Sequence, residues 1–585
     1  MIKEKINFKS VLLIIAMVIL IILSTSCNNS SDTDTCQNSN VDSTAKDTNT
    51  GEHIDTDSDI DTDTDSDTGN SDDITDSNTD TDSDAFSDTS TDINSDSNIN
   101  TDFNTDTDSD IETDTDVGNN DKPTLNIDLP LKDVMENYRG QTVNILAPVW
   151  TGNTASYPWS TVELCVVDYD MNASGYGEVI NNAVMERNEL IENTYGINLN
   201  WINAQSASMA NRLENAKRNS ETFHLAMPYI YEAMEIVIDK SLYTISDEYI
   251  NLNAEYYSEE VIDKLTLDGK TFFIGGDFSF LDEQNATVLF YNAQMLKELG
   301  SEAPDLYELV LNGTWTIDTM YSLAGSVSGN LDDEDKYTDN DKYGFATSDL
   351  TLFYQCFGVY QAQKRVDSLG RENFELDLQS EYINDIINNI LYAQKEKKIV
   401  RTSWTGGLSA AATAFEDNRV LFYNNVMQKS TSFKEGLEFG ILPFPKLNTE
   451  QDRYYAPVSQ RTTVLCIPKA TDDRVLSECM IEILTKSSSE AIMPAYLSTI
   501  ENKLHDNQKK KTIEIIEKEI FPNLMYDIGY VYGRYAGDGR GVATIIQSES
   551  VSAGFNSYKN AYMYNRVDAD SIFEDWSSAY HIYSE

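Results

Sequence analysis

A long tract that cannot form a hydrophobic core decides which part of this chain folds. From Asn28 to about Asp121 the sequence consists almost entirely of Asp, Thr, Ser and Asn, as in DTDSDIDTDTDSDTGNSDD. Such a segment buries too little apolar surface to offset its ordering entropy, and its like charges repel one another. The alternating Asp residues lack the recurring glycine and terminal bidentate acid of a calcium loop. We therefore expect a disordered spacer over residues 27–125, without a folded calcium repeat, and a folded part over residues 126–585.

The N-terminus has the layout of an export signal. Basic residues occupy the first positions, an unbroken apolar run covers residues 11–23, and small residues lead to Cys27. The apolar run is shorter than the ~20 residues that a membrane-spanning helix needs. The junction resembles a bacterial lipobox, although Leu23 lies four places before the cysteine instead of three. We expect residues 1–26 to be a lipoprotein signal peptide and a palmitate-bearing lipid on Cys27 to hold the exported protein on the outer face of the cell membrane. The alternative is an uncleaved anchor with an incidental cysteine.

Length and charge bound the folded part. Its size is too great for one compact core and predicts two lobes or domains. The net charge of the chain is -56, of which the spacer supplies about half. Nucleic acid is therefore not an expected partner, because phosphate binding needs clustered Lys and Arg. The cysteines of this part are too far apart for a zinc site, and we expect buried thiols, with a disulfide between the last two left open. They are Cys165, Cys356, Cys466 and Cys479.

The first stretch of the folded part alternates strands and helices. The order strand, helix, strand, helix, strand is predicted over residues 142–148, 178–195, 197–204, 206–219 and 223–231. This order is typical of an α/β protein with a parallel sheet, whose ligand crevice lies beyond the carboxyl ends of the strands. Aromatic residues follow two of those strand ends, at Trp150, Tyr229 and Tyr231. They are interpreted either as a floor for a ligand or as packing at the sheet edge.

Catalytic motifs give no support for an enzyme. The sequence has no serine elbow, no HExxH and no glycine-rich phosphate loop, and its histidines are scattered along the chain at His53, His224, His505 and His581. A glycoside hydrolase needs two carboxylates across a cleft, and a chain this rich in acids offers no way to single out such a pair. We therefore expect a protein that is not an enzyme and that holds neither a metal nor a cofactor.

Five segments, in this order, resemble a known family. They are YGEVINNAVMERNELIENTYGINL, TVLFYNAQMLKELG, PDLYELVLNGTWTIDTM, FEDNRVLFYNN and FGILPFPKLNTEQDRYY. Together they are similar to the extracellular solute-binding lipoproteins of bacterial ABC transporters, in particular to the sugar-binding group related to maltose-binding protein. The resemblance covers the folded part of the chain. The acidic spacer is much longer than the spacers of typical members.

The resemblance implies a fold and a division into lobes. The fold would be α/β and two-lobed, of the periplasmic-binding-protein type II or Venus flytrap kind, with a ligand cleft between the lobes and a disordered tail before them. Lobe 1 would comprise residues 126–285 and 437–500, and lobe 2 would comprise residues 286–436 and 501–585. The segment TVLFYN, residues 287–292, would be the first chain crossing between the lobes. LEFGILPFPK, residues 437–446, would mark the return.

The resemblance also implies a function. The protein would be a monomer that captures a carbohydrate, in particular an oligosaccharide, and delivers it to a transmembrane permease. A sugar site needs aromatic faces together with amides or carboxylates, and the family's loop after VLFYNN points to Tyr423 and Asn424. The full set of candidate ligand-binding residues is Trp150, Tyr229, Tyr231, Asp277, Tyr354, Trp404, Tyr423, Asn424 and Tyr455. A cell-surface adhesive or sensory carbohydrate-binding protein and a binding protein for a non-sugar solute remain as alternatives.

Overall fold

A computed structural model gives the fold of this chain. It describes residues 125–147, 177–204, 209–216, 218–331, 336–347, 349–376, 378, 381–459, 462–529 and 555–583. The chain divides into two units, Met1–Thr113 and Asp114–Glu585, and all the described residues belong to the second unit. The predictions of a signal peptide, of lipid on Cys27 and of a spacer lie outside the described residues, as do Trp150 and Cys165.

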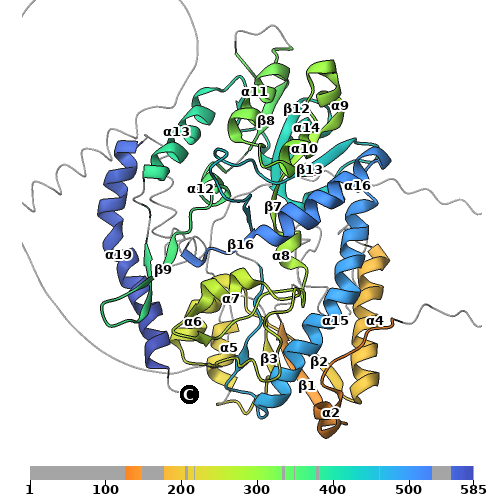
Figure 1. The fold of residues 1–585 in the computed structure, drawn as a ribbon, viewed down its shortest axis with the longest axis vertical. Helices are drawn as coiled ribbons and strands as arrows, with labels where there is room; N and C mark the ends of the chain where they lie inside the picture. Colours follow the sequence, from red (N-terminus) through yellow and green to blue (C-terminus); the bar gives the residue numbers. More distant parts are fainter. Residues whose placement is uncertain are drawn as a thin grey trace, which may run out of the picture. The chain divides into compact units, whose positions relative to one another are not determined.

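The sheet of the first lobe forms around a buried central strand (Figure 1). Strand β1 (Thr142–Ala147) lies between β2 (Asn198–Asn203) and β3 (Leu225–Ala226), and all three are parallel. The adjacent residues Ile145 and Leu146 point to opposite faces and are both fully buried, as expected for a strand covered on both faces. Helices α4 (Gly177–Tyr195) and α5 (Met209–Ala216) connect these strands, so the predicted strand and helix order is confirmed.

Two further segments extend this first sheet. Ala226 of β3 is bridged to Cys466 in the antiparallel sense, and the segment around Cys466 continues to Leu465, which is bridged to Ile274. The backbone of Ile274 donates to Leu465 at 3.0 Å and accepts from it at 2.8 Å. The first lobe therefore contains a strand that returns from late in the sequence, inserted between β3 and the segment around Ile274.

The second lobe has a five-stranded sheet in the order β11-β8-β12-β7-β13. The bounds of these strands are β7 (Thr287–Asn292), β8 (Tyr343–Ala346), β11 (Val400–Arg401), β12 (Val420–Val426) and β13 (Phe439–Leu442). Strands β11, β8 and β12 are parallel, β7 is antiparallel to β12, and β13 is antiparallel to β7. In each sheet the earliest of the three parallel strands, β1 or β8, lies between the other two. Next to β3 or β12 the sheet then has one antiparallel strand, which is the return strand in the first sheet and β7 in the second. The predicted two-lobed α/β fold is confirmed by this shared order.

The chain passes from lobe 1 into lobe 2 at a first crossing and returns at a second, and these two crossings touch. Strand β7 follows the last segment of the first sheet and makes the first crossing. The return differs from the sequence interpretation, because β13 pairs with β7 in the second sheet and residues 437–455 do not lead directly into lobe 1. Trp315 explains this, since its Nε1 donates to the carbonyl of Pro443 at 3.2 Å and fixes the proline segment on lobe 2. The actual return passes Val458, which is bridged to Ala286 at the first crossing.

Two long helices border the lobes (Figure 1). Helix α15 (Arg474–Glu501) packs against α4, and its N-cap is Asp473, whose side chain accepts from the backbone N–H of Leu476. The guanidinium of Arg187 on α4 is fully buried and donates to Ser488 Oγ at 2.8 Å, while it lies 5.7 Å from the ring centre of Trp201. These contacts attach the two helices to each other and to the first sheet.

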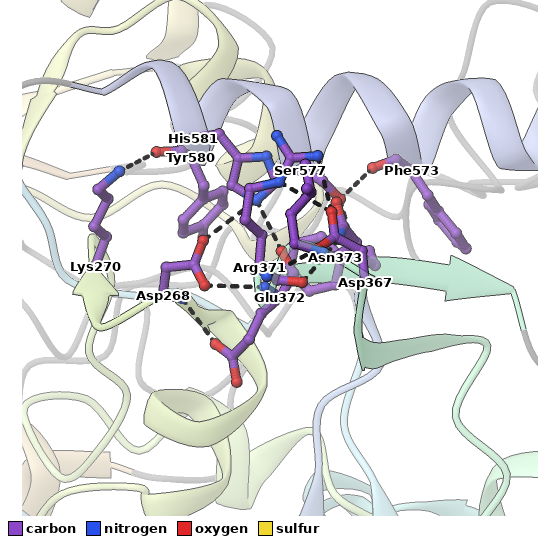
Figure 2. Close-up of polar contacts among 12 residues, drawn as sticks. Asp268, Lys270, Asp367, Arg371, Glu372, Asn373, Phe573, Ser577, Tyr580 and His581 are labelled. Carbon is purple, nitrogen blue, oxygen red and sulfur yellow. Dashed lines mark hydrogen bonds and ion pairs between the residues drawn. The ribbon is translucent and has the colours of Figure 1, made fainter.

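The C-terminal helix α19 (Phe555–Ile582) contacts both lobes (Figure 2). Tyr580 Oη donates to the carbonyl of Leu265 in lobe 1 at 2.6 Å, and Ser577 Oγ accepts from the backbone N–H of Phe374 at 2.9 Å. Phe374 belongs to the hairpin of β9 (Ala362–Val366) and β10 (Glu372–Leu376), which is inserted in lobe 2. The sequence analysis assigns residues 501–585 to lobe 2, and the structure shows that α19 contacts lobe 1 as well.

The structure also gives the state of three cysteines. Cys356, Cys466 and Cys479 are buried free thiols, so the predicted thiol state is confirmed for these three. Burial raises the pKa of each thiol above its ordinary value. Among the helices in the described ranges, none combines the length and apolar character that a membrane span requires.

Candidate functional site

The crossing region is the part of the structure where the carboxyl ends of strands from both sheets meet the two chain crossings. In the first lobe β3 leads into the short helix η4 (Ile230–Glu232), and in the second lobe β12 leads into η6 (Met427–Ser432). The backbone N–H of Met427 donates to the carbonyl of Ala286 at 2.8 Å, and η6 packs against α8 (Leu281–Gln284). Because ligands of α/β sheets bind beyond the carboxyl ends of parallel strands, we place the candidate site in this region.

Two predicted aromatic residues form a stacked pair at the carboxyl end of β3. The rings of Tyr229 and Tyr231 are 5.6 Å apart with an angle of 21° between their planes. Tyr229 is bridged to Thr463 of the return strand. On the other side of that strand, Asp277 follows three residues after Ile274, which is bridged to Leu465. The register therefore brings the tyrosine pair and Asp277 to the two sides of the same short segment of the return strand.

A group of carboxyl side chains lies between Asp277 and the first crossing. Asp282 and Glu283 of α8 are both 5% exposed. Burial, together with the neighbouring charge of Asp282, raises the pKa of Asp277 to about 7. Burial also raises the pKa of Asp282, and burial and then the charge of Asp282 raise the pKa of Glu283 well above its ordinary value. Tyr526 Oη donates to Asp282 Oδ2 at 2.5 Å. The raised pKa values favour the protonated, neutral form, in which a carboxyl group can donate a hydrogen bond as well as accept one.

Glu232 at the end of η4 is a fourth acid of this kind. Burial and then the charge of Glu235 raise its pKa to about 8, although its carboxyl group accepts from the backbone amides of Tyr229 and Met209. Its Oε2 atom is buried and has no hydrogen-bond partner. At neutral pH this side chain therefore carries a proton and presents one oxygen that no described protein group binds.

Several other polar atoms of the same region are buried without a hydrogen-bond partner. They lie on η4, on α8, directly after β8, on η6 and on the return strand. The atoms are Glu232 Oε2, Glu283 Oε2, Gln284 Nε2, Thr347 Oγ1, Gln428 Nε2, Ser430 Oγ, Thr462 Oγ1 and Thr463 Oγ1. An unpaired buried polar group costs about 1–3 kcal/mol. An ordered water or a ligand that reached these atoms would supply the missing partners.

The sequence analysis missed this set of residues. Gln, Ser and Thr side chains carry no motif, and their burial depends on how the crossings pack. The only available signal is position in the sequence. Gln428 and Ser430 follow VLFYNN within five residues, and Thr462 and Thr463 come directly before the apolar run that begins at Val464.

Trp404 and Tyr354 occupy different environments in lobe 2. Trp404 follows β11 and is half-buried, with its ring 5.6 Å from that of Tyr343 and its Nε1 buried without a partner. Trp404 therefore packs beside Tyr343, the first residue of β8, whereas Thr347 follows the last residue of that strand. Tyr354 on α12 (Leu352–Cys356) is fully buried, and its ring stacks on that of Tyr558 of α19 at 6.3 Å. This position is in the hydrophobic core.

Tyr423 and Asn424 lie within β12. Tyr423 is 1% exposed, and its ring is surrounded by those of Phe290, Phe415 and Phe433. Asn424 is buried and faces Leu289 of β7 in the strand register. The structure brings neither residue to the tyrosine pair of lobe 1, and the polar groups of η6 that follow them occupy the strand end instead.

Tyr455 supports a contact between the lobes. A Cβ atom on Gly358, whose φ is +80°, would lie only 2.6 Å from the Tyr455 ring, so the ring needs a glycine there. The guanidinium of Arg453 lies 4.8 Å from the centre of the same ring. Arg453 and Tyr360 both donate to Glu260 of α7 (Glu259–Leu265) in lobe 1, Arg453 at 3.3 Å. These residues connect the lobes away from the chain crossings.

Metal binding finds no support in the described part of the chain. No three His, Cys, Asp or Glu side chains there are arranged to hold an ion. Asp277, Asp282 and Glu283 instead carry raised pKa values, which a bound cation would oppose.

Comparisons with known proteins give structural similarities only. No family model matches the chain, and no curated protein matches it. Similar solved structures include the sugar-binding protein MalE from Xanthomonas citri (13% identity, TM-score 0.49, covering 76% of this chain and 100% of that one). Lmo0181 from Listeria monocytogenes, an ABC substrate-binding protein in complex with cycloalternan, is 9% identical (TM-score 0.44, covering 73% and 98%). MalX from Streptococcus pneumoniae, in complex with maltopentaose, is 15% identical (TM-score 0.42, covering 74% and 99%). Because these TM-scores are low, the fold assignment rests on the strand order shared by the two sheets.

Proposed function

We propose that this protein captures a carbohydrate, in particular an oligosaccharide, in the crossing region between its lobes and delivers it to the permease of an ABC transporter. The observation that carries the proposal is the set of buried polar atoms without partners beside the stacked pair of Tyr229 and Tyr231. Each sugar hydroxyl donates and accepts hydrogen bonds, and the C–H face of a sugar ring packs on aromatic side chains. One oligosaccharide could therefore satisfy amides, hydroxyls and carboxyls from both lobes at once.

The electrostatics of the region favour a neutral solute. The pKa of about 8 leaves Glu232 mainly uncharged near neutral pH, and the pKa of about 7 leaves Asp277 about half protonated, so both carboxyl groups can donate as well as accept hydrogen bonds. The chain carries a net charge of -56, which repels anionic solutes. A polyhydroxylated neutral ligand agrees with both features better than an anionic or a peptide-like solute does.

Closure of the lobes would convert binding into a signal for the permease. Glu260 of lobe 1 is held by Arg453 and Tyr360, so the described structure contains direct polar contacts between the lobes. A solute that binds groups on both lobes favours the arrangement in which those contacts form. The permease would then recognise the solute-bound arrangement. In this proposal the protein acts as a monomeric receptor and not as an enzyme.

The proposal includes attachment to the membrane. Lipid on Cys27 would hold the exported protein at the outer face of the cell membrane, with residues 28–125 as a spacer. We expect Cys27→Ser to move the protein from the membrane fraction to the medium and to abolish incorporation of a labelled fatty acid. Retention of this variant in the membrane would support the alternative of an uncleaved apolar anchor.

A thermal-shift screen of purified protein against mono-, di- and oligosaccharides, amino acids and short peptides tests the solute class. Ligand that binds the folded state raises the Tm. Thr463→Val and Gln428→Met remove buried polar atoms that have no partner, at nearly constant volume. We therefore expect both variants to keep or raise the Tm without ligand and to lose most of the sugar-induced shift.

Thr485→Val is the matched control. The Thr485 hydroxyl is buried but donates to the carbonyl of Ile481 at 2.8 Å, so its removal should lower the Tm and leave the sugar-induced shift unchanged. Shifts with amino acids or peptides but with no sugar would refute the carbohydrate assignment. A full sugar-induced shift in Thr463→Val and Gln428→Met would show that the ligand binds elsewhere.

A further inference from the structure

A pocket that is separate from the crossing region lies on the surface of lobe 2, between helices α11 (Ile317–Val327) and α13 (Glu381–Lys395). Its volume is about 370 Å³, and all its lining residues are polar or aromatic. They are Asp318, Tyr321, Ser322, Asn388, Asn389 and Tyr392. We propose that this pocket is a second saccharide-binding site, which holds a separate part of a long glycan, or a separate glycan, on the surface of lobe 2. The pocket shares no residue with the crossing region, so this inference goes beyond the proposed function.

Helical periodicity shows that the core does not require the side chains that α13 contributes to the pocket, whereas Tyr321 of α11 is buried in the core of lobe 2. On α13 the buried positions include Ile383, Ile386 and Ile390, which face the interior of lobe 2. Asn388 and Tyr392 lie on the opposite side and are exposed. A solvent-facing surface of a helix is ordinarily covered by charged side chains. Here two neighbouring helices instead present amides, hydroxyls and tyrosine rings to each other across an open pocket.

The two tyrosines supply the aromatic element of the pocket. The rings of Tyr321 and Tyr392 are 4.6 Å apart and tilted by 46°. Tyr392 is 37% exposed, so part of its ring surface is open to a ligand. The Tyr321 hydroxyl is buried and has no hydrogen-bond partner, although the residue is on a surface pocket. A ligand hydroxyl that reached this atom would supply the missing hydrogen bond.

The remaining lining groups define the class of ligand. Asp318 is the charged residue of the set, and no Lys, Arg or His lines the pocket, so an anionic ligand has no counter-charge. No aliphatic side chain lines it either, which disfavours a lipid or another apolar ligand. Asn389 uses one N–H on the carbonyl of Asp385 at 3.0 Å, and its amide oxygen accepts no hydrogen bond from a described residue. Aromatic faces with amide, hydroxyl and carboxylate groups, and without a cation, match a neutral polyhydroxylated ligand.

Isothermal titration of the full chain with maltoheptaose, cellohexaose and xylohexaose tests this site, using the tightest-binding glycan for the variants. We expect two classes of site in the unmodified protein. Tyr392→Ala should weaken the surface class about tenfold, as loss of one aromatic anchor does, and Tyr321→Phe should weaken it while keeping or raising the Tm. Tyr564→Ala, at an 84% exposed position on α19, is the matched control and should change neither class.

The outcomes separate this proposal from the proposed function. If Tyr392→Ala loses one class of binding site and Thr463→Val loses the other, the surface site and the proposed function are both supported. A single class that is lost in Thr463→Val and unchanged in Tyr392→Ala overturns the surface site and leaves the proposed function standing. A single class with the opposite response supports the surface site and refutes binding in the crossing region. Absence of binding by all three glycans overturns the surface site.

Discussion

Replacement of Glu232 by glutamine should make the stability of the protein less dependent on pH. Burial raises the pKa of Glu232 from 4.5 to about 8 in the folded protein. Each pKa unit corresponds to about 1.36 kcal/mol, so the difference amounts to about 5 kcal/mol of unfolding free energy between the two limits of pH. Because the folded pKa is the higher one, the folded state binds the proton more tightly. The contribution is fully present below about pH 4.5 and is lost as the pH rises to about 8.

Glutamine has the same shape as glutamic acid and cannot ionise. We therefore expect Glu232→Gln to have nearly the stability of the unmodified protein at about pH 5 and to exceed it by several kcal/mol at about pH 9. Urea unfolding followed by circular dichroism at both pH values measures the difference. Glu235→Gln is the control, because Glu235 is exposed one turn along and its loss should keep most of the pH dependence. The reasoning is refuted if Glu232→Gln and the unmodified protein differ in unfolding free energy by the same amount at both pH values.

Three further substitutions test contacts that hold the fold together. Tyr526→Phe removes the hydrogen bond to Asp282 and should cost about 1–3 kcal/mol, seen as a lower urea midpoint; an unchanged midpoint would contradict a buried bond there. Gly358→Ala places a Cβ atom against the Tyr455 ring at a φ of +80° and should lower the free energy of unfolding by about 1–3 kcal/mol, seen as a lower Tm. Adding Tyr455→Ala should recover part of this loss. Arg187→Lys keeps the charge but loses the planar guanidinium and should lower the unfolding free energy by about 1–3 kcal/mol, whereas equal stability would show that charge alone suffices.

The sequence predicted those parts of the fold in which local pattern and burial agree. Residues 142–231 alternate strand and helix because their apolar spacing matches the faces that the sheet and helices bury. The crossing at 287–292 was expected only from the family resemblance, and the structure shows a strand there that is buried along its whole length, as suits a position inside a sheet. The return crossing could not be predicted, because nothing local shows that Trp315 holds the proline segment on lobe 2.

The candidate site was harder to predict than the fold. The sequence pattern around an aromatic residue does not distinguish a ligand contact from a core position, and both Tyr229 and Tyr423 are buried in the folded protein. Gln428 and Thr463 matter because they are buried without partners, and burial of a polar side chain is a property of the assembled lobes. The raised pKa of Glu232 likewise follows from its surroundings and not from its neighbours in the sequence.

The return strand has a consequence for the order in which this chain can fold. Ala226 and Cys466, which lie side by side in the first sheet, are 240 residues apart in the sequence. During synthesis the N-terminal lobe must therefore wait with an unpaired sheet edge until the return strand around Cys466, which comes after the five-stranded sheet of lobe 2, has left the ribosome. Such non-local pairing folds slowly and exposes strand edges that can aggregate. A chain truncated before the return strand would lack an interior strand of its first sheet, so neither expression nor evolution can treat the first lobe as a separable module.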